Sequence, residues 1–181
     1  HTLYAANVSG DGTDVLERAY FAKEVGATAL MVAVGLVGFG WLHKLATDEK
    51  LRLPIIHHPA YSGGFVSPGV SGVADYLQLG LLPRIFGADM PIFVSYGGRF
   101  TFTEKQCKRI SSYIKRPMGL MKAACPAPGG GVTDARLNEL VELYGNDTMF
   151  LVGGDMFRRG PDIEANMSYF VERLTKLSER T

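Results

Sequence analysis

The sequence predicts an α/β protein in which helices cover a parallel β-sheet. Short apolar or β-branched runs alternate with amphipathic stretches along all 181 residues. No antiparallel hairpin signal such as Asn-Gly separates these runs. Strict β–α alternation requires crossover connections, which place the helices outside a parallel sheet. The apolar fraction of 46% and the charged fraction of 20% agree with an ordinary globular core.

Six strands are expected, because six runs are short and nearly all apolar, as strands buried on both faces are. They are residues 3–8, 29–34, 53–57, 91–95, 119–125 and 148–152. Gly, Ser, His or Pro stands at or just after their ends, where such residues interrupt a sheet.

Helices are expected between these strands. Apolar residues at helical spacing predict helices over residues 15–25, 137–144 and 163–177. Thr103 and Thr133 each precede an acidic residue and are typical helix starts. Residues 69–82 form the least favourable helix, because Gly69, Gly72 and Gly80 lower helix propensity.

Two architectures fit such a sheet, the doubly wound open sheet and the TIM (β/α)8 barrel. Residues 9–12 form too loose a turn for the G-x-G-x-x-G pattern of a nucleotide-binding open sheet. A barrel needs eight βα units and about 250 residues, so six units fall two short. We therefore expect residues 1–181 to be the C-terminal part of a barrel, covering about strands three to eight, with the first strands absent from this chain.

Composition excludes several classes of protein. The 19 Lys and Arg residues nearly balance the 18 Asp and Glu residues, which gives no electrostatic case for nucleic acid or an anionic membrane. No apolar run reaches the roughly 18 residues of a spanning helix, and no signal peptide pattern is seen at residue 1, so neither feature is expected. Two cysteines are too few for a disulfide scaffold, so a cytoplasmic location is expected.

Two glycine clusters follow the last two predicted strands, at the end of the sheet where barrel active sites form. They contain Gly130, Gly131, Gly153 and Gly154. Glycines there let backbone N–H groups approach an anion, and barrels commonly bind phosphate at these loops. Tight turns also use glycine, but two clusters after consecutive strands favour a phosphate site.

His57 and His58 end the third predicted strand. Adjacent strand residues face opposite ways, so at most one imidazole faces the barrel axis, and the sequence does not say which. That ring would act as a general acid or base, or donate a hydrogen bond to a substrate oxygen. The alternative is a hydrogen-bonded structural histidine.

Arg99 follows two glycines in a strand-end loop, which suits a mobile lid that closes over a phosphate or carboxylate. The alternative is a solvated loop arginine, which is also the interpretation preferred for Arg158 and Arg159. The acidic residues are scattered, and none form a cluster with metal-ligand spacing.

Four segments carry a resemblance to a known family. They are residues 53–65 (LPIIHHPAYSGGF), 86–99 (FGADMPIFVSYGGR), 128–131 (PGGG) and 152–154 (VGG). In order and approximate spacing they resemble the catalytic barrel of the RuBisCO large subunit, and more specifically the RuBisCO-like proteins. The resemblance covers essentially the whole chain and implies an N-terminal α+β domain outside it.

The resemblance also implies roles for single residues. Gly130, Gly131, Gly153 and Gly154 fall where the family binds a substrate phosphate through backbone amides. Arg99 falls at the lysine of the carboxylases' mobile loop. His57 matches a strand histidine, and His58 replaces an arginine that contacts a second phosphate.

Departures from the carboxylase pattern indicate a non-carboxylating member. Gly129 stands where carboxylases carry a substrate-binding serine, and Met90 and Ile92 stand where they carry histidines. Arg99 keeps the positive charge of the loop lysine, but its planar fork cannot place a proton as an ammonium does.

The resemblance implies an enolase, isomerase or decarboxylase that acts through a Mg²⁺-stabilised enolate on a phosphorylated keto compound. The Mg²⁺ ligands are expected upstream of this chain, so no residue here is assigned to the metal. A homodimer is implied in the same way. The alternative is a non-catalytic barrel that binds a phosphorylated metabolite.

Overall fold

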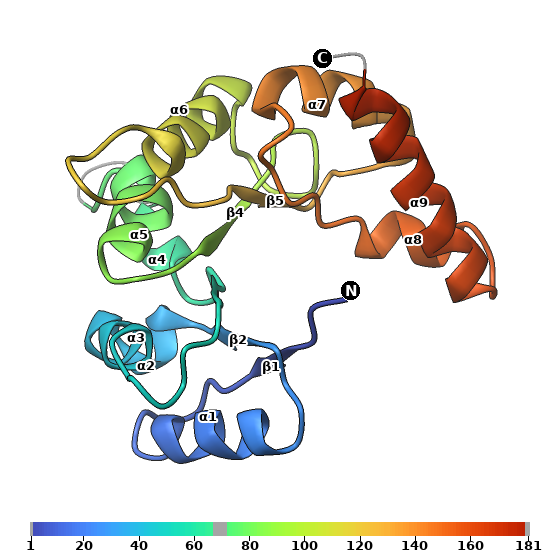
Figure 1. The fold of residues 1–181 in the computed structure, drawn as a ribbon. Helices are drawn as coiled ribbons and strands as arrows, with labels where there is room; N and C mark the ends of the chain where they lie inside the picture. The colour runs from blue at the N-terminus through green and yellow to red at the C-terminus, as the bar shows by residue number, and fades with distance from the viewer. Residues whose placement is uncertain (1, 67–71, 180–181) are drawn as a thin grey trace.

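The computed structural model describes residues 2–66 and 72–179. Within them, five strands form one parallel sheet in chain order. They are β1 (Ala5–Asn7), β2 (Ala29–Val32), β3 (Ile55–His57), β4 (Met90–Val94) and β5 (Ala127–Gly129). Figure 1 shows the strands on the inside of a curved arrangement, with the helices on its outside. The predicted parallel α/β architecture is confirmed.

The helices lie between the strands, as the alternation predicts. They are α1 (Val15–Glu24), α2 (Val34–Val37), α3 (Phe39–Ala46), α4 (Gly63–Val66), the π-helical η1 (Leu77–Leu81), α5 (Leu82–Ile85), α6 (Glu104–Lys115), the 3₁₀ turn η2 (Asp134–Arg136), α7 (Leu137–Tyr144), α8 (Gly153–Arg158) and α9 (Ile163–Ser178). The Thr103 hydroxyl and the Gln106 side chain form a capping box that starts α6. In the described part of the chain, no helix is long and apolar enough to cross a membrane.

The expected helix over residues 69–82 is only partly observed. Gly69 and the two residues after it lie outside the described residues. The described part contains η1, which continues directly into α5. A Cβ at Gly80 would lie 3.0 Å from the carbonyl oxygen of Ile110, so glycine here lets η1 pack closely against α6.

The expected strand over residues 119–125 is wrong, because the strand forms two residues later, as β5. Residues 118–121, which precede β5, instead form a turn with an isolated Met118–Met121 bridge. Arg84 holds this turn, since the residue is 3% exposed and, among the described residues, its guanidinium donates to backbone carbonyls. The acceptors are the carbonyl oxygens of Tyr113, Arg116, Met121 and Lys122, at 2.6 to 3.4 Å.

The expected strand over residues 148–152 runs beside β5 but forms only one bridge. The N–H of Met149 donates to the carbonyl oxygen of Pro126 at 2.9 Å, and that of Leu151 donates to Pro128 at 3.2 Å. Leu151 forms a parallel bridge with Gly129. The segment therefore has the sixth position in the sheet without the length of a regular strand.

Apolar side chains pack on both faces of the sheet. One outer core includes Leu30, Leu42 and Ile55 and lies under α1 and α3. A second outer core lies under α6, α7 and α9, and its members include Phe93, Ile110, Leu140 and Phe170. A small inner cluster contains Ile56, Ile92 and Ala127. Alternate residues of β3 therefore face the helices and the barrel interior, as a strand buried on both faces requires.

Candidate active site at the carboxyl ends of the strands

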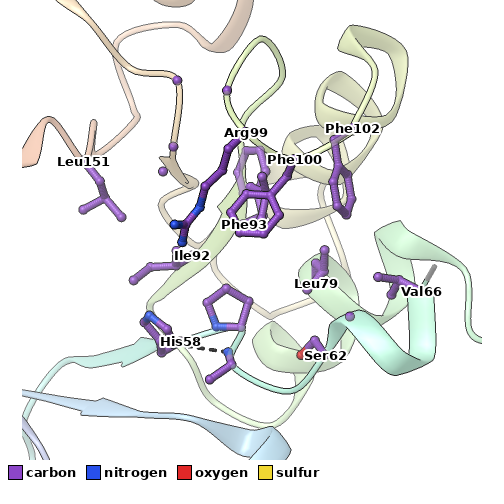
Figure 2. A pocket seen from close by; sticks show the side chains of 18 of the residues that line it. His58, Ser62, Val66, Leu79, Ile92, Phe93, Arg99, Phe100, Phe102 and Leu151 are labelled. Atoms are coloured by element: carbon purple, nitrogen blue, oxygen red, sulfur yellow. Dashed lines mark hydrogen bonds between the residues drawn. The ribbon is translucent and has the colours of Figure 1, made fainter. Parts of the chain in front are cut away.

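A cavity of about 860 Å³ lies at the carboxyl ends of β3, β4 and β5. The loops that follow these strands form its walls, and Arg158 of α8 contributes from the rim. Apolar side chains make up much of the lining, among them Val66, Leu79, Ile92, Phe102 and Leu151 (Figure 2). Among the described residues, no Asp or Glu lines the cavity.

The two neighbouring histidines are in different environments. His57 is fully buried, and neither of its ring nitrogens has a hydrogen-bond partner in the described residues. It ends β3 one residue after Ile56, which belongs to the inner cluster, so its ring faces the opposite side of the strand. Burial lowers the pKa of His57 to about 3, which keeps the ring neutral.

His58 is the histidine that lines the cavity. Its Nδ1 accepts a hydrogen bond of 3.2 Å from the backbone N–H of Ala60, drawn as a dashed line in Figure 2. Because Nδ1 is the acceptor, the neutral ring carries its proton on Nε2. The pair that the sequence could not separate therefore divides into one ring buried in the fold and one ring that can donate at the cavity.

Arg99 reaches across the cavity from the loop after β4. Figure 2 shows its guanidinium extending toward the side of Ile92 and His58. The residue is exposed, and its guanidinium carbon lies 4.8 Å from the ring centre of Phe100. Arg99 has no ion pair in the part of the chain that the structure describes. Its positive charge is therefore available to an anion that enters the cavity.

The loop that carries Arg99 lies directly against the glycine turn after β5. A Cβ built on Gly131 would lie 2.7 Å from the backbone nitrogen of Gly98, and one built on Gly98 would lie 2.8 Å from that of Gly131. Gly130 and Gly131 also have backbone φ angles of 76° and 72°, which residues other than glycine rarely adopt. Both members of this contact therefore need to be glycine.

Gly153 and Gly154 are the first two residues of α8 and are exposed. They are not among the described residues that line the cavity, whereas Gly130 and Gly131 are. The Asp155 carboxylate connects α8 to the neighbouring loop by accepting the backbone N–H of Asp134 at 2.8 Å. That hydrogen bond is the main cause of a lowered pKa at Asp155.

Polar residues that the sequence did not assign to the site also line this cavity. Arg158 is exposed, as expected of a solvated arginine, and it also lines the cavity and pairs with Asp155 at 3.0 Å. Ser62 also lines the cavity, and its buried hydroxyl has no partner among the described residues. The three-residue spacing of Asp155 and Arg158 was a usable signal, whereas nothing in the sequence marks Ser62.

The described residues do not fit a Mg²⁺ site. None of them form a group of three or more His, Cys, Asp or Glu side chains able to hold a metal ion. Mg²⁺ prefers carboxylate and other oxygen ligands. The described residues that line the cavity include no Asp or Glu side chain. The described residues can therefore bind and orient a ligand and form hydrogen bonds with it.

Comparisons with known proteins connect this geometry to a family. The chain is 32% identical over 168 residues to ribulose bisphosphate carboxylase-like protein 1 of Rhodopseudomonas palustris, a match covering 93% of this chain and 44% of that protein. It is 33% identical over 153 residues to a 2,3-diketo-5-methylthiopentyl-1-phosphate enolase of Bacillus cereus, covering 84% of this chain and 37% of the enzyme. No family model matches the sequence.

The fold gives the same result. The crystal structure of a RuBisCO-like protein from Alicyclobacillus acidocaldarius superposes with a TM-score of 0.86 at 30% identity, over 99% of this chain and 46% of that one. This chain is a relative of the RuBisCO-like proteins. Its sheet therefore corresponds to part of the TIM barrel of that family, as the sequence predicts. The chain spans less than half the length of the RuBisCO-like relatives it matches.

Proposed function

We propose that the protein is an enolase-type enzyme of the RuBisCO-like family, which enolises a phosphorylated keto compound and does not fix CO₂. The observation that carries the proposal is the meeting of three elements at one cavity: His58, the unpaired Arg99 and the Gly130–Gly131 turn. The relationship to an enzyme named as a 2,3-diketo-5-methylthiopentyl-1-phosphate enolase supports the reaction class.

Under this proposal, the glycine turn binds the substrate phosphate. Backbone N–H groups of Gly130 and Gly131 would donate to its oxygens, since no side chain blocks their approach. No neighbouring atom lies within 4 Å of a Cβ built on Gly130, Gly153 or Gly154, so all three leave open space for a ligand. Gly153 and Gly154 belong to this site by family resemblance.

His58 and Arg99 would act on the rest of the substrate. Enolisation transfers a proton from the carbon next to a carbonyl to a base and leaves negative charge on the carbonyl oxygen. The described cavity lining contains no Asp or Glu, so under this proposal the base lies outside the described residues. A hydrogen bond from Nε2–H of His58 to that oxygen would stabilise the enolate as the charge develops. His57 receives no contact with substrate, because its ring lies on the other side of β3.

Arg99 bears on which keto compound is used. A guanidinium forms a planar, two-pronged hydrogen-bond pair with a carboxylate, and Arg99 has no carboxylate partner among the described residues. The proposal therefore slightly favours a keto acid that carries a phosphate. A requirement for Mg²⁺ with ligands outside the described residues, and a homodimeric assembly, are further parts of the proposal.

The direct test is proton exchange at carbon in the complete protein. In D₂O with Mg²⁺, an enolising enzyme replaces the hydrogen next to the carbonyl with deuterium, which NMR detects without knowledge of the final product. The probes are 2,3-diketo-5-methylthiopentyl-1-phosphate and a phosphorylated keto acid of similar size. Enzyme-dependent exchange into either supports the proposal, and exchange into neither contradicts it.

A second candidate is a barrel that binds a phosphorylated metabolite without turning it over. The absence of acidic side chains from the described cavity lining favours this alternative. Calorimetry with the same two compounds separates the candidates. Binding with a Kd in the micromolar range and no deuterium exchange would support the binding protein.

A further inference from the structure

Arg136 joins the two loops that form the mouth of the cavity. Its Nη1 donates to the carbonyl oxygen of Tyr96 at 2.7 Å and to that of Gly131 at 3.0 Å. Tyr96 follows β4 and opens the loop that carries Arg99, whereas Gly131 belongs to the glycine turn after β5. One nitrogen of one side chain therefore connects the loop of Arg99 to the turn proposed to bind phosphate.

The other two nitrogens of the Arg136 guanidinium bind Glu139. Nη2 and Nε of Arg136 donate to the two carboxylate oxygens of Glu139 at 2.9 and 3.2 Å. The guanidinium carbon also lies 4.5 Å from the ring centre of Tyr96, whose hydroxyl donates to Glu139. Such paired, charge-assisted hydrogen bonds fix the direction of an arginine more strongly than a single contact does.

The backbone of the loop is shaped to admit this side chain. A Cβ on Gly97 would collide with the guanidinium of Arg136, and Gly97 has a φ of 75°. A glycine at position 97 therefore lets Arg136 approach the loop, just as a glycine at position 98 lets Gly131 approach it. Burial and the neighbouring Glu139 raise the pKa of Tyr96 to about 12, so its hydroxyl keeps its proton.

We infer that Arg136 is a positioning residue that holds the Arg99 loop against the glycine turn and so fixes the distance between two anion-binding elements. The inference rests on the proposed function, since it assumes that both elements bind one phosphorylated ligand. Arg136 itself does not line the cavity as described, so it acts through the loops that it connects.

The test compares Arg136→Met and Arg136→Lys in the complete protein, with Arg173→Met as the matched control. Arg173 is also a half-buried arginine, with a carboxylate 3.5 Å away on Asp134 and a hydrogen bond to Asn138, but among the described residues it makes no hydrogen bond or ion pair with either loop. Two quantities are measured. One is the rate of tryptic cleavage after Arg99 relative to cleavage after Lys50, and the other is the Kd for inorganic phosphate.

In Arg136→Met we expect relative cleavage after Arg99 to rise about tenfold and phosphate binding to weaken about tenfold, because charge-assisted hydrogen bonds are lost. Arg136→Lys keeps the charge but not the fork, so both values should lie between Arg136→Met and wild type. Arg173→Met should match wild type.

The outcomes separate the inference from the function on which it rests. Unchanged cleavage in Arg136→Met, or an equal rise in Arg173→Met, overturns the role of Arg136. A rise in cleavage with unchanged phosphate affinity overturns its positioning of the ligand. If the wild-type protein binds no phosphate, the proposed function fails, and the cleavage ratio still decides whether Arg136 holds the loop.

Discussion

Gly98 and Gly131 meet backbone to backbone at the mouth of the cavity, and neither position has room for a Cβ. The contact brings a loop after β4 against a turn after β5, and it sets how closely Arg99 approaches the proposed phosphate site. Two glycines that are 33 positions apart in the sequence thus act as one structural unit.

Gly131→Ala should destabilise the protein by roughly 1–3 kcal/mol, because the alanine would be strained at a φ of 72° and would collide with Gly98. Inorganic phosphate should bind at least about tenfold more weakly. Gly40→Ala is the control, since its Cβ enters open space in α3, away from the proposed phosphate site, and should leave phosphate binding unchanged and stability unchanged or slightly higher. Urea unfolding and calorimetry measure the two effects, and equal behaviour of the two variants would contradict the prediction.

Arg99→Ala should raise KM for a substrate that carries a carboxylate or abolish its turnover, with little change in Tm, because the side chain is exposed. Arg18→Ala is a suitable control, since Arg18 makes only an exposed i,i+4 pair with Asp14. Steady-state kinetics on the complete protein measure the effect. Unchanged kinetics in Arg99→Ala would exclude a role for Arg99 in binding substrate.

His58→Phe should lower kcat by about 10²–10³-fold, the usual cost of removing one hydrogen-bond donor to a developing oxyanion. His58→Gln keeps an N–H donor and should retain more activity than His58→Phe. The deuterium-exchange rate of the substrate measures this without a coupled assay. If both variants exchange as fast as wild type, His58 has no part in enolisation.

His57 should make the protein less stable in acid. Its folded pKa of about 3 lies below the ordinary value of 6.5, so the unfolded chain binds this proton first as the pH falls. The free energy of unfolding should therefore fall by about 2 kcal/mol between pH 7 and pH 5 through this group alone. His57→Leu removes the titrating ring, and urea unfolding at both pH values should show a shallower loss than in wild type. An identical loss would mean that other groups cause the acid sensitivity.

Arg84→Met should destabilise the fold by about 3 kcal/mol or more, because the carbonyls of Met121, Lys122 and their neighbours lose a buried charged donor. Arg116→Met is the control, because the Arg116 guanidinium packs on the Tyr113 ring and is not the donor to these carbonyls. Urea unfolding compares them, and a loss below about 1 kcal/mol in Arg84→Met would show that water replaces the guanidinium at little cost.

Local patterns predicted much of the fold. The capped helix after Thr103 and the helix stopped by Gly145 form where expected, because hydrogen bonds within a few residues decide them. The strand over residues 119–125 was misplaced for the opposite reason. Pro126 indicated a strand end, whereas residues 121 and 122 instead bind the guanidinium of Arg84, more than 30 residues away, and β5 forms where the chain pairs with β4.

The sequence predicted which residues form the site better than it predicted the contacts between them. His58, Arg99 and the glycine turn follow strand ends, and parallel strands bring such loops together whatever the details of packing. Which of two adjacent histidines faces the cavity depends on where β3 ends. The role of Arg136 depends on two carbonyls from distant loops, and backbone carbonyls leave no trace in a sequence pattern.

The two outer cores divide the helices of the molecule into two groups. Leu30 and Ile55 belong to one core and Phe93 and Ile110 to the other, and the change from one core to the other falls between β3 and β4. A substitution in one core should therefore add independently to a substitution in the other. Because each outer core packs its own apolar side chains and the two halves share the small inner cluster, the halves should open in stages and suit exchange of segments between related barrels.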